Sequence, residues 1–133
     1  MSENRVLDQI EAAAAHAGFC VLPRNPKKLA CSVWDMPDPA YHKGVLWRTN
    51  TGAIRVEKRF IRFGLPGVPD FTGWLFSNGR RIDIEAKTDN GKLSPAQKAY
   101  SGLCLKTGVM WGMARSYGEA AALFDLWQDM EKK

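Results

Sequence analysis

The sequence predicts one α/β domain over residues 1–133, with a mixed central sheet flanked by helices. Three observations support this prediction. Helical periodicity marks both ends of the chain, short strand-like segments lie between them, and a helix, a strand and a second helix follow one another after residue 94. At 133 residues the chain has the length of a single domain, and its hydrophobic content of 45% is that of an ordinary globular protein.

The N-terminal half is predicted to hold a helix, a long loop and two strands. The helix is expected over residues 2–17, because apolar residues recur there at spacings of three and four, at Val6, Leu7, Ile10, Ala13, Ala14 and Ala17. Residues 21–44 contain four prolines and are expected to be mostly loop. Strands are expected over residues 45–48 and 54–63, with Thr51 and Gly52 in the turn between them.

A β-hairpin is predicted after the stretch rich in glycine and proline at residues 64–69. Its strands are expected over residues 71–76 and 81–87, with the dipeptide Asn78-Gly79 at the tip. If these two residues form the whole turn, Asp70 lies directly opposite Lys87. Because side chains alternate along a strand, Glu85 then shares the face of Lys87, and the other face carries Ile82, Ile84 and Ala86.

Two helices and a strand are predicted after the hairpin. Ser94 with Gln97 forms a capping box, so a helix is expected to begin there and to end near Gly108. A buried strand is expected over residues 109–114. A second capping box at Ser116 predicts the last helix of the domain.

The charge of the chain favours an acidic partner. The formal net charge is +5 and the pI is about 9.3, and nucleic acid is the commonest acidic partner of small basic domains. The sequence has no run of eighteen apolar residues and no start typical of a signal peptide. We therefore expect a cytoplasmic protein that does not associate with membranes. The spacing of Cys20, Cys31 and Cys104 predicts free buried thiols, and no role is assigned to His16 or His42.

Asp70, Glu85 and Lys87 are the candidate catalytic residues, because the predicted hairpin brings them together on one face. Cross-strand geometry puts the two acids about 7 to 8 Å apart, a separation at which they can share a divalent cation. Mg²⁺ prefers oxygen ligands, so Asp70, Glu85 and the Ala86 carbonyl are candidate ligands, while Lys87 would orient water or stabilise charge on a phosphate. The same geometry also fits a surface cluster in which a lysine neutralises two acids.

The dipeptide Pro69-Asp70 and, after the hairpin, the tripeptide Glu85-Ala86-Lys87 resemble the motif of the PD-(D/E)XK nuclease superfamily. The longer strings RFGLPGVPD (62–70), IEAK (84–87) and GKLSPAQ (91–97) are similar to the VRR-NUC (virus-type replication-repair nuclease) family, within a likeness that runs from about residue 47 to residue 122. This resemblance implies a restriction-endonuclease-like sheet and hydrolysis of DNA phosphodiester bonds with Mg²⁺ or Mn²⁺. Family members that stand alone at this size are similar to phage and bacterial enzymes that act on branched DNA such as Holliday junctions, often as homodimers.

The resemblance also implies two further site residues. Gln97 matches the active-site glutamine of the family, a role that is compatible with its place in the capping box of Ser94. The family carries a glutamate on its first helix, for which Glu3 and Glu11 are the candidates. Glu3 is preferred because it falls inside the apolar face of the predicted helix. An interaction of this first-turn acid with the helix dipole alone is the alternative.

Five basic residues are predicted to contact DNA phosphates, with a solvated strand face as the alternative: Arg48, Arg55, Lys58, Arg59 and Arg62. The tryptophans, including Trp111 and Trp127, are expected in the core and not as base-stacking platforms. The predicted enzyme is therefore a metal-dependent deoxyribonuclease, expected to act as an endonuclease. A non-catalytic nucleic-acid-binding module of the same fold is the alternative, and the complete set of candidate catalytic residues argues against it. A metal-dependent hydrolase of another phosphoester is a third possibility.

Overall fold

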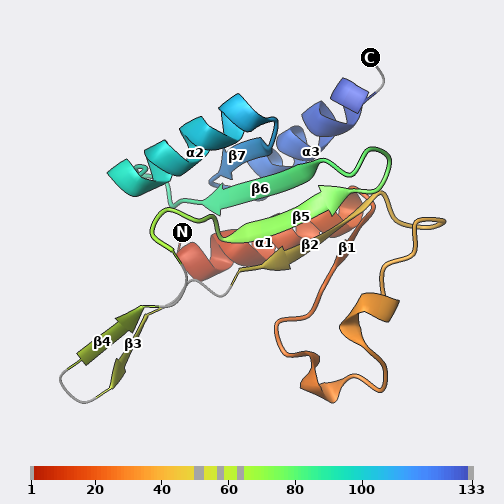
Figure 1. Cartoon of the computed structure of the whole chain (residues 1–133), viewed down its shortest axis with the longest axis horizontal. Coiled ribbons are helices and arrows are strands. Elements are labelled where there is room, and N and C mark those ends of the chain that lie inside the picture. Colours follow the sequence, from red (N-terminus) through yellow and green to blue (C-terminus); the bar gives the residue numbers. More distant parts are fainter. Residues whose placement is uncertain (1, 50–52, 57–58, 63–64, 132–133) are drawn as a thin grey trace.

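The chain folds into a five-stranded sheet, three helices and a separate two-stranded ribbon (Figure 1). The structure is a computed structural model and describes residues 2–49, 53–56, 59–62 and 65–131. Helices lie on both sides of the mixed sheet, so the predicted α/β fold class is confirmed.

The sheet has the strand order β1-β2-β5-β6-β7. Its members are β1 (Phe19–Val21), β2 (Gly44–Arg48), β5 (Phe71–Leu75), β6 (Arg81–Ala86) and β7 (Met110–Ala114). Pairing is antiparallel between β2 and β5 and between β5 and β6, and it is parallel at both edges. The parallel pair of β6 and β7 is joined by helix α2 (Pro95–Thr107), because a parallel connection has to cross back over the sheet.

Helices α1 (Glu3–His16) and α3 (Tyr117–Glu131) cover one side of the sheet, which we call the core face. The predicted periodicity of α1 is confirmed, since its buried residues are Val6, Ile10, Ala13 and Ala14. They pack with apolar side chains of β5, β6 and α3, among them Phe71, Ile82, Ile84, Phe124 and Trp127. Burial of each large side chain contributes roughly 1.5–3 kcal/mol, so this layer is the main source of stability.

The opposite side of the sheet, which we call the α2 face, has two separate covers. Helix α2 lies over β6 and β7, while residues 22–43 cover β1 and β2 and contain the short 3₁₀ turns η1 (Pro26–Lys28) and η2 (Val33–Asp35). Under the second cover, a small core is formed by Cys20, Leu22 and Val45 with Val33, Trp47 and Phe76. Strand β5 runs between the two covers, and its Trp74 is 36% exposed.

The hairpin of β5 and β6 has a longer loop than predicted. The Leu75 amide donates to the Arg80 carbonyl over 2.9 Å, so four residues connect the strands where two were predicted. Phe71 therefore pairs with Ile84, and the same register continued by one residue puts Asp70 opposite Glu85. The predicted opposition of Asp70 and Lys87 is wrong. Since the shift is two residues, every side chain keeps its predicted face.

The single strand predicted over residues 54–63 is instead an antiparallel ribbon of two strands, β3 (Ala53–Val56) and β4 (Arg59–Arg62). In Figure 1 this ribbon lies away from the five-stranded sheet. The composition of the segment favours β-structure throughout, and so it does not reveal where the chain reverses. The predicted turn at residues 51–52 lies outside the described residues. Strand β1 was not predicted, because three residues are too few to show an alternation.

The capping boxes predicted for the last two helices are found in different degrees. At α2, the Gln97 amide donates to the Ser94 hydroxyl and the Ser94 amide donates to the Gln97 side chain, so both halves are present. At α3, the Glu119 amide donates to the Ser116 hydroxyl, but the Glu119 carboxylate accepts from the Arg115 amide. Both helices therefore begin where the local sequence predicts.

The three cysteines are free, as predicted. Cys20 and Cys104 are buried, whereas Cys31 is exposed and its predicted burial is wrong, because the segment that carries it lies on the surface. In the described part of the chain, none of the helices combines the length and the apolar character needed to cross a membrane.

Candidate active site

Asp70 is held at the start of β5 by contacts of the backbone around it. Gly67 has φ +86°, and a Cβ at this position would lie 2.4 Å from the carbonyl oxygen of Ala96 in α2. Only glycine therefore lets this loop approach the helix. The Thr49 hydroxyl donates to the Pro69 carbonyl, and the Thr49 amide donates to the Asp70 carbonyl over 2.8 Å. These contacts with the residue that follows β2 fix the backbone from which the Asp70 side chain extends.

Asp70 and Glu85 form a pair of adjacent acids. The Ala86 amide donates to Asp70 Oδ2 over 2.8 Å, which directs the Asp70 carboxylate across to β6. Glu85 is only 4% exposed. Its burial, followed by the charge of Asp70 and a side-chain hydrogen bond with it, raises the pKa of Glu85 to about 9. The surroundings of Glu85 therefore favour its protonated form.

Lys87 lies two residues after Glu85 on the same face of the sheet. Its Nζ is 4.0 Å from Glu85 Oε1, and its side chain is 18% exposed. The Lys87 amide donates to the Ala114 carbonyl over 3.1 Å, which prolongs the pairing of β6 with β7. The sheet therefore positions an ammonium group beside the two carboxylates, with an opening to solvent.

Gln97 makes the helix cap predicted from the sequence and also contacts the acid pair. Its Oε1 accepts from the Ser94 amide over 2.9 Å, which caps α2, and its Nε2 donates to Glu85 Oε1 over 2.9 Å. One amide thus joins the start of α2 to the candidate active site. The helix cap fixes the direction from which the donor reaches the carboxylate.

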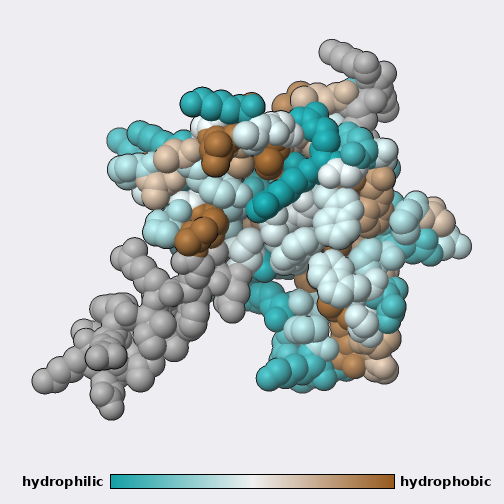
Figure 2. All heavy atoms as spheres, in the orientation of Figure 1, coloured by the Kyte–Doolittle hydropathy of each residue, from teal (hydrophilic) through white to brown (hydrophobic). Residues whose placement is uncertain are grey.

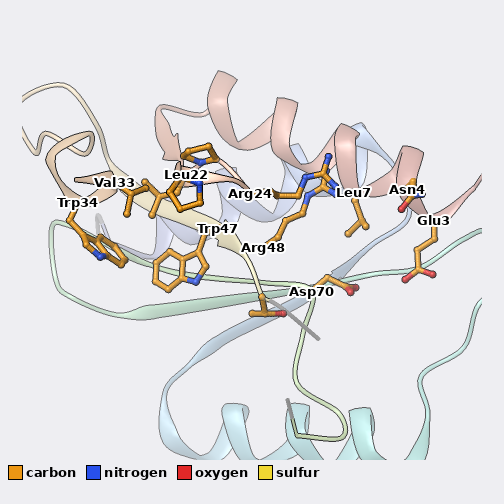
Figure 3. Close-up of a pocket in the computed structure, with 13 residues that line it drawn as sticks. Glu3, Asn4, Leu7, Leu22, Arg24, Val33, Trp34, Trp47, Arg48 and Asp70 are labelled. Carbon is orange, nitrogen blue, oxygen red and sulfur yellow. The ribbon is translucent and has the colours of Figure 1, made fainter. Parts of the chain in front are cut away.

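The structure separates the two glutamates proposed for the first helix. Glu3 lines a pocket of about 660 Å³ together with Asp70, and Figure 3 shows both carboxylates near one end of it. The charge of Glu3 also contributes to the raised pKa of Glu85. Glu11 instead forms an ion pair with Arg48, which also binds Asp8 over 2.7 Å. The geometry therefore places Glu3, and not Glu11, beside the acid pair.

Arg48 does not lie on a solvated strand face, which was the alternative to the predicted phosphate contact. Its side chain is 9% exposed, its guanidinium binds Asp8 and Glu11, and it lies 5.8 Å from the centre of the Phe71 ring. Arg48 thus joins β2 to α1, and its contact with phosphates stays a prediction. Among the described residues, its Nε is the buried side-chain donor that has no hydrogen-bond partner.

The other predicted phosphate contacts belong to the β3–β4 ribbon. Arg55 lies on β3, and Arg59 and Arg62 lie on β4. Lys58 lies outside the described residues. The backbone positions thus gather three arginines on one ribbon that is separate from the main sheet.

A second buried acid, Asp83, was not proposed from the sequence. It is fully buried on the α2 face, where it accepts from Thr72 Oγ1 over 2.7 Å, from Arg81 Nε over 3.1 Å and from the Tyr100 hydroxyl. Burial and the bond to Asp83 raise the pKa of Tyr100. The signal available in the sequence was its position two residues before Glu85, which places both acids on the same face.

Asp70 and Glu85 together offer carboxylate oxygens that suit a divalent cation. Within the described ranges, no group of three or more His, Cys, Asp or Glu side chains is arranged to hold a metal ion. Mg²⁺ needs only one or two carboxylates when it keeps several waters, and Asp70 and Glu85 supply two. Two acids whose proximity raises a pKa are also stabilised when a cation replaces the proton between them.

One known family matches the chain. The VRR-NUC domain matches residues 24–117, well over half of the sequence, and this span contains Asp70, Glu85, Lys87 and Gln97 but not Glu3. No curated protein sequence matches the chain.

Proposed function

Because this chain belongs to the VRR-NUC domain family, we propose that it is a Mg²⁺- or Mn²⁺-dependent deoxyribonuclease that cuts within DNA strands. The nuclease-type function follows from the family. The observation that supports catalysis by this chain is the pairing of two acids, Asp70 and buried Glu85, within reach of the Lys87 ammonium and the Gln97 amide.

In this proposal, Asp70, Glu85 and the backbone carbonyl of Ala86 hold the cation. When bound, the cation would supply a positive charge for the phosphate and would acidify water. The protein itself contributes the geometry, because Asp70 is oriented by the Ala86 amide and Glu85 by the Gln97 amide. These two bonds keep the carboxylates together in the absence of substrate, so little reorganisation is needed on binding.

Lys87 provides the positive group of the protein at this site. Its ammonium lies 4.0 Å from Glu85 Oε1 and its side chain keeps an opening to solvent, so a phosphate that reaches the acid pair also reaches Lys87. A preorganised cation at this position would stabilise the negative charge that develops during phosphodiester hydrolysis. Glu3, at the same end of the pocket, would orient a water molecule or a second cation.

DNA is the proposed substrate, and branched DNA such as a Holliday junction is the proposed form, as the family resemblance implies. The net charge of +5 and the three arginines on the β3–β4 ribbon support binding of a polyanion. A homodimer and a cytoplasmic location belong to the same proposal.

The experiment that tests the proposal compares three DNA substrates. Wild type and Asp70→Asn would each be incubated with supercoiled cruciform plasmid, a linear duplex and a synthetic four-way junction, in Mg²⁺, Mn²⁺ or EDTA. We expect metal-dependent cutting of the branched substrates that is lost in Asp70→Asn. Asp125→Asn, which changes an exposed acid on α3, is the matched control and should cut normally.

Two results would count against the proposal. If neither wild type nor Asp125→Asn cuts any substrate, yet both bind DNA in a salt-dependent way, the non-catalytic binding module replaces the nuclease. If a small phosphoester is hydrolysed and DNA does not compete for the site, the substrate class is wrong.

A further inference from the structure

Two tryptophan side chains on the α2 face are more exposed than large aromatic residues usually are. Trp34, in η2, is 54% exposed, and Trp74, in β5, is 36% exposed, whereas Trp127 in the core is 3% exposed. An indole has a large apolar face, and burying it inside the protein would be favourable. The expectation that the tryptophans belong to the core therefore fails for these two.

The exposed rings form an ordered group with a third tryptophan. Trp34 and Trp74 are close to parallel, with ring centres 6.3 Å apart and an interplanar angle of 26°. Trp47, from β2, lies nearly perpendicular to both, with centre distances of 5.5 Å to Trp34 and 5.9 Å to Trp74. We call Trp34, Trp47 and Trp74 the tryptophan platform. The partly buried Trp47 supports two rings that are 54% and 36% exposed.

The tryptophan platform is continuous with the candidate active site. The pocket of about 660 Å³ is lined by Asp70 at one end and by Trp34 and Trp47 at the other, and Figure 3 shows these side chains in succession along it. A second cavity of about 490 Å³ continues past Trp47 and Trp74. Trp74 also follows Asp70 by four residues on the same face of β5, a separation of about 13 Å along a strand.

Arginines accompany the rings. Arg24 lines the first pocket, and Arg81, whose side chain is 54% exposed, lines the second. Figure 2 shows that the strongly hydrophobic side chains on the visible side of the molecule form only small, scattered groups among hydrophilic and neutral ones. A surface of this kind, with flat rings beside arginines, suits an anionic aromatic ligand better than an apolar protein partner.

We infer that the tryptophan platform stacks unpaired bases of the DNA strand whose phosphate lies at Asp70 and Glu85. The inference rests on the proposed nuclease function and narrows its substrate class from branched DNA in general to branched DNA that leaves unpaired nucleotides beside the site of cleavage. Stacking on an indole requires a free base face, which a fully paired duplex offers only at its ends. Arg24 would contact a phosphate that flanks the stacked bases, without reading the sequence, whereas the Arg81 guanidinium already donates to Asp83.

Binding measurements without cleavage test this inference. The affinity of the full chain would be measured in EDTA by fluorescence anisotropy, for a labelled duplex with a single-stranded tail of six nucleotides and for the same duplex with paired ends. Stacking of one base on an aromatic ring is worth about 1–3 kcal/mol, so Trp34→Leu and Trp74→Leu should each weaken binding of the tailed DNA about 5- to 150-fold. Binding of the blunt duplex should change less than about 2-fold.

Matched variants separate stacking from packing. Trp34→Phe and Trp74→Phe keep a ring and should retain most of the affinity for tailed DNA, whereas leucine keeps only apolar bulk. Tyr41→Leu changes an aromatic residue of the same segment that is 83% exposed but lies outside the tryptophan platform, and it should bind normally. Thermal unfolding would verify that each variant is folded. In wild type, the tailed DNA should also quench tryptophan fluorescence more than the blunt DNA does, a readout that needs no substitution.

Several outcomes would overturn the inference. Equal losses on tailed and blunt DNA, unchanged affinity in both leucine variants, or equal quenching by the two DNAs would each show that the rings do not stack unpaired bases. A change in self-association caused by the leucine variants, with DNA affinity unchanged, would assign the surface to a contact between copies of the chain. Because these measurements need no cutting, a wild type that binds tailed DNA through the tryptophans but cuts nothing would contradict the proposed function and not the tryptophan platform.

Discussion

Asp83 and Glu85 occupy neighbouring positions on the same face of β6, and both are almost completely buried, but their surroundings differ. Asp83 faces donors, since Thr72, Arg81 and Tyr100 all provide a hydrogen to its carboxylate. Glu85 accepts a hydrogen bond from Gln97 and lies 4.0 Å from the Lys87 ammonium, but it also faces a second acid, Asp70, and its pKa is raised to about 9. Two residues along one strand therefore separate an acid surrounded by donors from one that shares its site with a second acid, for which we propose a bound cation.

This difference assigns separate roles to the two acids. A buried carboxylate whose oxygens are occupied by donors stabilises the arrangement of the elements that supply them, here β5, β6 and α2. A second carboxylate nearby raises the free energy of the ionised form of a buried carboxylate. Such pairs are typical of functional sites. Substitutions at Glu85, Asp83, Gln97 and Tyr100 test whether the two acids have these separate roles.

Glu85→Gln should abolish most of the activity without lowering stability. Removal of one electrostatic contact to a transition state costs about 100- to 1,000-fold in rate, so single-turnover cleavage in Mn²⁺ should fall by at least that factor. The amide has nearly the same shape as the protonated acid and removes the cost of keeping Glu85 protonated in the folded state, so the midpoint of thermal unfolding should stay the same or rise. A variant that cuts normally, or one that unfolds at much lower temperature, would place Glu85 among the structural acids.

Asp83→Ala should give the opposite pattern, with a large loss of stability. The substitution leaves the Thr72 and Tyr100 hydroxyls and the Arg81 guanidinium without their acceptor, which should lower the free energy of unfolding by about 3 kcal/mol. Urea unfolding measures this quantity. A loss below about 1 kcal/mol would mean that the donors around Asp83 find other partners and that the network does not hold α2 in place.

Gln97→Glu separates the cap of α2 from the contact with Glu85. Glutamate at this position preserves the capping box, so the free energy of unfolding should change by less than about 1 kcal/mol. It cannot donate to Glu85 and adds a negative charge, so cleavage should fall about 10- to 100-fold, the range typical of residues that orient metal ligands. Gln97→Ala, which loses both functions, is the comparison. Normal cleavage by Gln97→Glu would restrict Gln97 to its capping role.

Tyr100→Phe should have the smallest effect of the four substitutions. Its difference from wild type in the free energy of unfolding should be clearest at high pH. Loss of one hydrogen bond costs about 1 kcal/mol of stability near neutral pH. Because the pKa of Tyr100 is raised in the folded state, the unfolded chain releases this proton first, and stability is lost as the pH rises above the ordinary tyrosine value of 10.0. Urea unfolding at pH 8 and pH 11 should therefore show a smaller alkaline loss for Tyr100→Phe than for wild type. An identical loss in both proteins would contradict the assignment.

The elements that local sequence predicted well are those whose stabilising contacts lie within a few residues. The apolar stripe of α1 and the capping box of α2 at Ser94 were predicted because a helix repeats within four positions. The face shared by Asp70, Glu85 and Lys87 was also predicted, because the alternation of a strand survives a register shift of two. The cation and the catalytic roles assigned to these residues stay predictions.

Other features could not be predicted, because they depend on contacts between distant parts of the chain. An arginine on a strand is a plausible phosphate ligand from the sequence alone. The ion pairs of Arg48 with Asp8 and Glu11 of helix α1 could not be predicted. The hairpin loop was taken as two residues, although Leu75 and Arg80 close a loop of four. The position of Asp83 in its strand does not predict that the Tyr100 hydroxyl of α2 donates to it.

Short-range periodicity and capping are enough to predict the fold class, the positions where helices begin, and the ionisable groups on one face of the hairpin. The packing of distant segments sets which acid lies opposite Asp70, brings Glu3 and not Glu11 into the same pocket, and brings Trp34 and Trp74 together beside Trp47. Those contacts depend on loop lengths and on the packing of helices against the sheet. The physical reason is that a contact between distant residues is selected by the burial of the whole core, which no local pattern encodes.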